Sequence, residues 1–243
     1  MTPHSQSPGL EPKAQSQMFP TVIVSARGEQ RIRRGHPWVY AADVIEAQAE
    51  GGEIVHVVGA RRRSLGYALF SDRSQIPLRM LTRGEIVPDL ALLRTRLQHA
   101  LSFRASLDLD ATAFRIVHAE ADLLPSLVVD KYGDYLVVQA LSQGMDRLLP
   151  SIVSMLVELT SPAGILARND PKVRLLEGLE QTVETLYGDV PESVLVREGP
   201  VEYSVDLRKG QKTGLFLDQR ENREAAARYA RGKLLDCFSY HGG

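Results

Sequence analysis

The sequence has little that would crosslink the chain or anchor it in a membrane. A single cysteine, Cys237, in 243 residues cannot form an intramolecular disulfide, which favours a reducing compartment. The longest apolar runs, such as residues 123–129 and 135–141, are far shorter than the roughly 18 residues needed to span a bilayer. No charged-then-apolar leader opens the sequence. We therefore expect a cytoplasmic protein without a transmembrane segment.

Lysine is absent from residues 20–105, where arginine is abundant. This region holds 13 Arg and 8 acidic residues, a net charge of +5, whereas residues 106–243 have a net charge of −6. The whole chain has a net charge of −1, which excludes a uniformly basic nucleic-acid coat. The local arginine excess nevertheless makes the N-terminal part suited to a polyanion.

The sequence shows no internal repeat and no metal-binding pattern. Its six histidines form no i, i+4 pair and have no cysteine partner, so we expect no metal site. His118 lies near Glu120 and Asp122, and strand alternation would place all three on one face. A polar surface or an interdomain contact is favoured over a proton-transfer cluster.

Residues 1–88 divide into a tail and a β-rich unit. Residues 1–18 are rich in Pro, Ser and Gln and predict a flexible, disordered tail. Residues 19–88 alternate short β-branched runs with Gly and Pro, which predicts a small β-barrel or sandwich. The expected strands are 22–24, 38–40, 53–58, 64–70 and 76–81. Arg61–Arg63 are expected at an exposed hairpin tip.

Residues 89–192 are predicted to form an α/β unit. Leucine and alanine recur at helical spacing over residues 89–106. The expected elements after this helix are strands 117–130 and 135–141 around a turn at 131–134, a helix at 147–159, a strand at 164–168 and a short helix at 172–176. This order of strands and helices indicates an α/β layer.

Residues 193–243 are predicted to begin a third unit. The expected elements are strands 194–196 and 201–207, a polar loop, a helix at 218–230 and an apolar strand at 233–238 that runs into Gly242. A strand leading into a glycine turn is typical of nucleotide sites in doubly wound sheets, because glycine lets the backbone approach the ligand. On the pattern alone, a structural turn is an equally good alternative.

Two adjacent segments carry a family resemblance. Gly210–Arg223 (GQKTGLFLDQRENR) precedes Asp236–Gly243 (DCFSYHGG). The pair resembles the cofactor-binding entry of class I S-adenosylmethionine-dependent RNA methyltransferases, specifically the large-subunit ribosomal RNA cytosine-5 methyltransferase I family.

Further segments agree with this family. Residues 34–40 and 74–83 resemble its N-terminal PUA domain, a small RNA-binding pseudo-barrel, and residues 117–133 resemble its central α/β domain. The resemblance therefore covers residues 20–243. Ala119 and Ser126 stand where the family pattern has glycine.

The resemblance implies a multidomain α+β and α/β architecture. It consists of a PUA-like β-barrel (19–88), a central α/β domain (89–192) and the beginning of a Rossmann-like methyltransferase domain (193–243). The implied enzyme transfers a methyl group from S-adenosylmethionine to cytosine C5 in 23S ribosomal RNA. Such chemistry requires a cysteine thiolate that adds to C6. The catalytic part, including this cysteine, is expected beyond residue 243, so this fragment alone is expected to be inactive.

The resemblance also implies a set of cofactor contacts. An acid can accept hydrogen bonds from the cofactor ammonium, an arginine can hold its carboxylate, and aromatic rings can flank the adenine or the sulfonium. The implied contacts are Lys212, Thr213, Gly214, Phe216, Asp218, Arg220, Asp236, Phe238, Ser239, Tyr240 and Gly242. The plain alternative for Asp218 and Arg220 is a helix start with an acid near its positive end.

The candidate RNA contacts come from the arginine-rich region. They are Arg33, Arg34, Arg61, Arg62, Arg63, Arg79 and Arg83. Arginine contacts to phosphate would position RNA without reading its sequence. Trp38 and Tyr40 could stack on bases, although Trp38 is favoured as barrel core.

Cys237 and the overall function leave alternatives. Cys237 lies inside the expected strand 233–238, where a packed core thiol is favoured over a nucleophile. The alternatives to the enzyme are a non-catalytic PUA-type RNA-binding module and a dimerisation scaffold, in which the central domain would form a homodimer interface.

Overall fold

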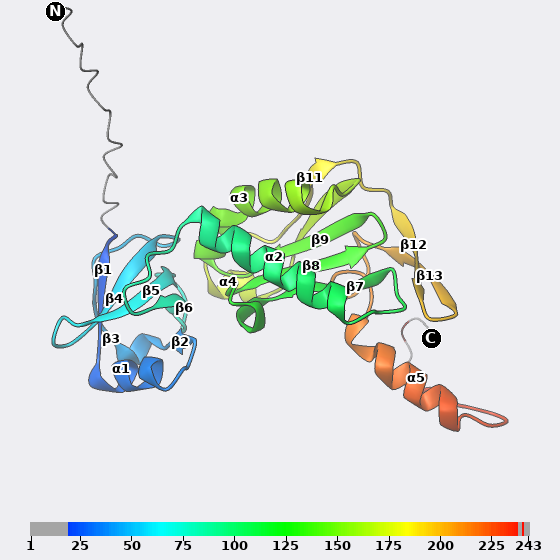
Figure 1. Ribbon diagram of the computed structural model, residues 1–243, viewed down its shortest axis with the longest axis horizontal. Helices are drawn as coiled ribbons and strands as arrows, with labels where there is room; N and C mark the ends of the chain where they lie inside the picture. The colour runs from blue at the N-terminus through cyan, green and yellow to red at the C-terminus, as the bar shows by residue number, and fades with distance from the viewer. Residues whose placement is uncertain (1–18, 238–239, 241–243) are drawn as a thin grey trace, which may run out of the picture.

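The computed structural model describes residues 19–237 and 240 (Figure 1). The predicted tail at 1–18, together with residues 238–239 and 241–243, lies outside the described residues. Two mixed β-sheets, flanking helices and a two-stranded hairpin make up the described part, which confirms the predicted multidomain α/β class. No helix in this part is long and apolar enough to cross a membrane.

The first sheet has six strands in the order β2-β6-β5-β4-β1-β3. Its strands are β1 (Thr21–Val24), β2 (Trp38–Val39), β3 (Val44–Ala47), β4 (Ile54–Gly59), β5 (Ser64–Phe70) and β6 (Leu78–Arg83). Strands β1 and β4 are parallel, and the other neighbours are antiparallel. The expected strands are confirmed within two residues, but β3 was not predicted.

Helix α1 (Ala26–Arg33) was also not predicted, and it is followed by the 3-10 turn η1 (Ala41–Asp43). Gly28 in its middle weakens a helix prediction. The helix begins because the Ser25 hydroxyl accepts a hydrogen bond from the Gly28 amide at 3.1 Å. Gly28 also suits the close packing there, since a Cβ would lie 3.1 Å from that of Asp43. The helix carries Arg27 and Arg31 to the surface.

The central sheet has five strands in the order β11-β10-β9-β8-β7. Its strands are β7 (Ala113–His118), β8 (Leu127–Tyr132), β9 (Tyr135–Ala140), β10 (Gly164–Asn169) and β11 (Thr182–Gly188). Only β9 and β10 are parallel. Strand β11 was not predicted, because its side chains are mostly exposed and show no apolar alternation.

The predicted single strand over 117–130 is wrong. The 3-10 turn η2 (Ala119–Asp122) and a loop divide it into β7 and β8. Ala119 and Ser126 adopt left-handed backbone angles, with φ of 45° and 59°. These are the two positions where the family pattern has glycine, the residue that adopts such angles without a steric cost.

Two long helices cover one face of the central sheet, α2 (Leu90–Ser106) and α3 (Gln143–Thr160) (Figure 1). A single turn, α4 (Val173–Leu176), follows β10. The Asp89 side chain caps α2 by accepting from the Leu92 amide at 2.7 Å, as expected for a helix starting there. Leu69 and Leu81 of the first sheet join the core under α2 and α3.

A hairpin of β12 (Ser193–Glu198) and β13 (Val201–Asp206) covers part of the opposite face. Its Val194 and Val205 share a core with Tyr132 and Val137 of the central sheet. The hairpin therefore packs with the central sheet, although it follows the domain boundary predicted at residue 192.

The C-terminal part consists of the 3-10 turn η3 (Leu217–Gln219), helix α5 (Arg220–Tyr229) and an extended segment. The predicted strand over 233–238 does not form within the described residues, and Leu235 is 85% exposed. No described strand pairs with this segment to satisfy its backbone. Cys237 is exposed, so the predicted packed core thiol is wrong.

Candidate functional site

A cavity of about 940 Å³ lies between the central sheet and the loop at residues 208–220. Strand alternation turns Val128, Asp130 and Tyr132 of β8 away from helices α2 and α3. The hairpin covers the Tyr132 end of this face, whereas Val128 lines the cavity. The lining is therefore mixed, with the apolar Val128 and Leu141 beside the polar Gln139 of β9.

Arg168 of β10 holds the beginning of the 208–220 loop. Its guanidinium donates to the carbonyl oxygens of Leu207 at 2.7 Å and Gly210 at 3.0 Å. Asp170 accepts two further hydrogen bonds from the same guanidinium. Arg168 is 3% exposed, so its hydrogen bonds are protected from water and fix the entry of the loop.

The middle of the loop enters the protein at Thr213, which is 1% exposed. Its hydroxyl donates to Asp130 Oδ2 at 2.6 Å and lies 2.9 Å from the Tyr132 hydroxyl. Gly214 is also buried. A Cβ at this position would lie 2.7 Å from Cγ1 of Val205 in the hairpin, so only glycine fits. Thr213 and Gly214 are both buried and neither lines the cavity, so their predicted contacts with the cofactor stay a prediction.

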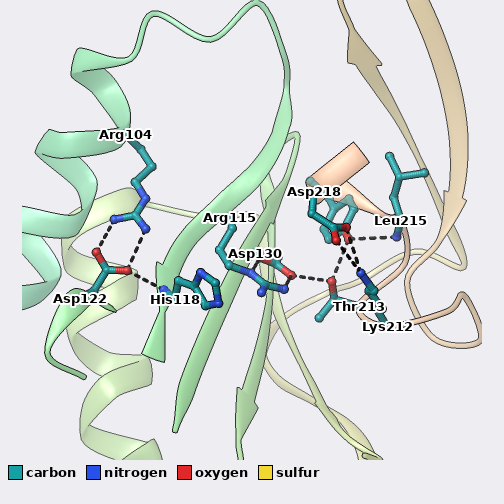
Figure 2. A network of polar contacts seen from close by, with 10 residues as sticks. Arg104, Arg115, His118, Asp122, Asp130, Lys212, Thr213, Leu215 and Asp218 are labelled. Atoms are coloured by element: carbon teal, nitrogen blue, oxygen red, sulfur yellow. Dashed lines mark hydrogen bonds and ion pairs between the residues drawn. The ribbon is translucent and has the colours of Figure 1, made fainter. Parts of the chain in front are cut away.

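Arg115 of β7 links the cavity to this buried carboxylate (Figure 2). Its guanidinium donates to both oxygens of Asp130, at 2.8 and 2.9 Å. Donating these hydrogen bonds to Asp130 raises the pKa of Arg115, which therefore stays charged. Asp130 is completely buried, so a paired cation is what makes its charge tolerable.

The outward side of the loop gathers four predicted cofactor residues. Lys212 forms an ion pair with Asp218 at 2.9 Å, and its ammonium lies 4.4 Å from the ring centre of Phe216. The Tyr240 ring meets Phe216 edge-on at 5.7 Å, and its hydroxyl accepts from the Gln211 amide at 3.0 Å. The hydrogen bond from Lys212 lowers the pKa of Asp218. The site thus presents an acid, a base and aromatic rings together.

The remaining predicted cofactor residues are less closely grouped. Arg220 lines the cavity and pairs with Glu221, whose pKa is lowered by that hydrogen bond. Asp236 is exposed. Phe238, Ser239 and Gly242 lie outside the described residues.

The predicted RNA-binding arginines separate into two environments. Arg33, Arg34, Arg83 and the three residues of Arg61–Arg63 are exposed. Arg79 is buried and forms an ion pair with the buried Glu177 at 2.8 Å. In this arrangement the Arg79 guanidinium faces Glu177 of the central domain and not the solvent. The prediction of Arg79 as an RNA contact is therefore corrected.

Two arginines that the sequence analysis missed lie beside Arg34. Arg27 and Arg31 of α1 line a second cavity of about 600 Å³ together with Arg34 and His36. The Arg31 guanidinium lies 4.7 Å from the ring centre of Tyr40. Their i, i+4 spacing could have placed both on one helix face, but it does so only once α1 is known to be a helix.

Trp38 and Glu120 join the first sheet to the central domain. Trp38 is half-buried, and its indole N–H donates to Glu120 at 2.8 Å. Asp122 instead accepts from Arg104 and from the His118 backbone amide. The interdomain contact favoured for this cluster is therefore present, but η2 rather than strand alternation produces it. Among residues 19–237 and 240, no group of three His, Cys, Asp or Glu side chains could hold a metal ion.

Comparison with known proteins identifies relatives over most of the chain. A PUA-like domain family model matches residues 22–83. Proteins named ribosomal RNA large subunit methyltransferase I are similar: the one from Tolumonas auensis is 38% identical, covering 93% of this chain and 59% of the relative. The one from Aliivibrio fischeri strain ES114 is 39% identical, covering 91% and 58%.

Solved structures agree on the fold. A protein assigned as a SAM-dependent methyltransferase from Streptococcus mutans superposes with a TM-score of 0.72 at 21% identity, covering 86% of this chain and 54% of that one. A second structure, assigned as a methyltransferase in complex with SAH, has the same TM-score and identity and covers 85% and 52%. The chain thus spans somewhat more than half the length of the proteins it matches. Over nearly all of its length it is similar to proteins named ribosomal RNA large subunit methyltransferase I, the family that its motifs resemble.

Proposed function

We propose that this chain is the N-terminal part of an S-adenosylmethionine-dependent methyltransferase that acts on large-subunit ribosomal RNA. The observation that carries the proposal is 38% identity over 93% of the chain to a protein of that name. Because the chain covers 59% of that relative, the activity is proposed for the whole protein. Transfer to cytosine C5 is what the motif resemblance implies.

The outward side of the 208–220 loop fits the chemical groups of this cofactor. The Asp218 carboxylate suits an ammonium, and Arg220 suits a carboxylate. The Phe216 ring already has one cation, the Lys212 ammonium, 4.4 Å from its centre, which supports its proposed role beside a sulfonium. When bound, the cofactor supplies an electrophilic methyl group. Lys212 and Tyr240 complete the proposed contacts from the described residues.

The cavity beside the loop suits a nucleotide of the substrate. Its volume of about 940 Å³ is in the range of small-molecule sites. The Gln139 Nε2 in its lining donates to the Arg168 carbonyl oxygen at 2.8 Å, so Oε1 is the Gln139 atom that can accept from a base edge, while Arg115 and His118 can contact phosphate. The cavity adjoins Lys212 and Asp218, so a nucleotide there would lie next to the proposed cofactor.

The exposed arginines of the first sheet supply a second RNA contact in this proposal. Arg33, Arg34, Arg61, Arg62, Arg63 and Arg83 are retained from the sequence prediction. The exposed Arg27 and the half-buried Arg31 are added, although both share the buried Asp43 as an ion-pair partner. Arg31 and Tyr40 already stack, the arrangement that single-stranded RNA bases exploit. A cytoplasmic location and the absence of a metal requirement belong to the same proposal, and a homodimer stays a prediction.

The first experiment is an intact-mass measurement on the endogenous protein, captured with an antibody against residues 19–88. A mass larger than 26.9 kDa by roughly 15 kDa, the size of the rest of a domain, supports the proposal. Methyl transfer from labelled S-adenosylmethionine to large-subunit RNA is then expected. A mass near 26.9 kDa with salt-dependent RNA binding and no transfer would instead favour the non-catalytic RNA-binding module.

A further inference from the structure

The central domain reaches the 208–220 loop through side chains that lie outside the predicted cofactor site. Asp130 and Tyr132 are both completely buried. They contact a loop residue, Thr213, that follows 83 and 81 positions later in the sequence. Such a polar connection between distant segments calls for an explanation, because a buried polar group costs free energy unless it is hydrogen-bonded.

The donors and acceptors of this connection form one directed chain (Figure 2). The Leu215 amide donates to the Tyr132 oxygen at 3.1 Å. The Thr213 hydroxyl donates to Asp130, so the 2.9 Å contact between the two hydroxyls requires Tyr132 to be the donor. Burial raises the pKa of Tyr132, so it keeps the proton that it donates. Each hydroxyl therefore both accepts and donates.

The loop backbone bends on both sides of Thr213. Lys212 adopts a φ of +55° and Gly214 a φ of +142°. A lysine in the left-handed region has a steric cost and persists only where its surroundings impose it. This bend turns Thr213 into the protein and leaves Lys212 outside, where it pairs with Asp218.

We propose that Asp130 and Tyr132 are positioning residues, which hold Thr213 and thereby fix the 208–220 loop in the shape that presents Lys212, Phe216 and Asp218 to the cofactor. This inference rests on the proposed function for the identity of the ligand. Arg115 completes the arrangement, because it holds Asp130 from the cavity side. The central domain, beyond linking two other domains, would set the cofactor affinity of the enzyme.

The first test is amide hydrogen exchange of this chain in four forms: wild type, Thr213→Val, Thr213→Ser and the control Thr160→Val. Thr213→Val keeps the side-chain volume but removes one hydrogen bond from each of Tyr132 and Asp130, which keep the Leu215 amide and Arg115 as their other partners. Thr213→Ser keeps the hydroxyl. Thr160 has a part-buried hydroxyl bonded within α3, to Leu156.

We expect loop amides to exchange about tenfold faster or more in Thr213→Val. Thr213→Ser and Thr160→Val should exchange like wild type in the loop, and α2 and α3 should be unchanged in all four forms. Unchanged loop exchange in Thr213→Val would overturn the proposal. So would an equal acceleration throughout the central domain, which would mean a purely structural role. If Thr213→Val does not fold, Tyr132→Phe serves in its place, with the same two outcomes.

A second test uses S-adenosylhomocysteine and the endogenous protein with its natural C-terminal extent. Thr213→Val should weaken binding about tenfold, and Thr213→Ser should restore it. Equal affinity of wild type and Thr213→Val overturns the positioning role. If the wild type itself does not bind, the proposed function fails. The exchange experiment still decides whether the hydrogen bonds from Thr213 to Asp130 and Tyr132 fix the loop.

Discussion

The central domain contacts its two neighbours by different chemistry. Toward the first sheet, it uses charge: Glu177 accepts from Arg79 at 2.8 Å and from the Ser71 hydroxyl at 2.5 Å, and all three side chains are buried. Toward Thr213, in the middle of the 208–220 loop, it uses the neutral hydroxyls of Tyr132 and Thr213, which end on one carboxylate, Asp130; the charged Arg168 holds only the beginning of the loop.

The difference concerns what happens when each contact breaks. Separating a buried ion pair leaves an uncompensated charge away from water, which costs several kcal/mol. Opening a neutral hydroxyl contact costs less, about 1–3 kcal/mol for each group left unsatisfied. The first sheet is therefore locked to the central domain, whereas the loop can open locally while the rest of the molecule stays folded.

The largest effect is expected from Glu177→Ala. The variant leaves Arg79 buried without its carboxylate, so the free energy of unfolding should fall by about 3–5 kcal/mol, measured by urea denaturation. The control Glu158→Ala removes an exposed partner of Arg94 and should change it by less than about 1 kcal/mol. A loss below about 1 kcal/mol in Glu177→Ala would contradict the locked interface.

The second effect concerns the loop. Tyr132→Phe leaves the buried Leu215 amide without its acceptor, and we expect a loss of about 1–3 kcal/mol in the free energy of unfolding. The matched control is Tyr135→Phe, since the Tyr135 hydroxyl has no hydrogen-bond partner among the described residues. Equal losses in both variants would contradict a specific contribution of the Tyr132 hydroxyl, because both substitutions keep the ring.

A third experiment tests whether the exposed arginines between β4 and β5 contact RNA. Replacing Arg61, Arg62 and Arg63 by alanine should leave stability within about 0.5 kcal/mol. RNA affinity should fall, and its logarithmic salt dependence should weaken by about 0.7 for each phosphate of single-stranded RNA that the variant no longer neutralises. Fluorescence anisotropy at several salt concentrations measures both, with Arg94→Ala as the control outside the first sheet. An unchanged salt slope would remove these three residues from the RNA surface.

The smallest effect is the pH dependence of the exposed pair Lys212–Asp218. Hydrogen bonding to Lys212 lowers the pKa of Asp218 in the folded protein. The pair therefore stabilises the loop at pH values above the ordinary aspartate range, and this contribution is lost as pH falls through the lowered pKa. Carbon-13 NMR titration should show the Asp218 pKa rising toward the ordinary aspartate range in Lys212→Ala. An unchanged titration would show that the pair does not form in solution.

Much of the fold was predictable because alternation and helical spacing are local. The patterns of β4, β5 and α2 predict elements that the structure confirms. The errors arise where distant contacts decide. Helix α1 depends on its cap and on a close approach of Gly28 to Asp43, and the apolar pattern of residues 233–237 predicts a strand that finds no partner among the described residues.

The site was predictable only in part, for a related reason. The motif places Lys212, Phe216 and Asp218 together on one loop, as the structure does. Alternation also puts Asp130 and Tyr132 on one face of β8, but it does not say which later segment covers that face. The sequence likewise cannot distinguish Arg79 from the exposed arginines, because the carboxylate that buries it, Glu177, lies 98 residues away.

Leu69 and Leu81 belong to the first sheet by chain order, yet they lie in the hydrophobic core under α2 and α3. The approach is so close that a Cβ on Gly144, in the first turn of α3, would lie 2.7 Å from that of Leu69. The PUA-like unit is therefore not an interchangeable module. Cutting the chain near residue 88 would expose both leucines to water on one side and uncover α2 and α3 on the other. Heating should melt the two units in a single calorimetric transition. A graft of this sheet onto another protein must therefore include α2 and α3.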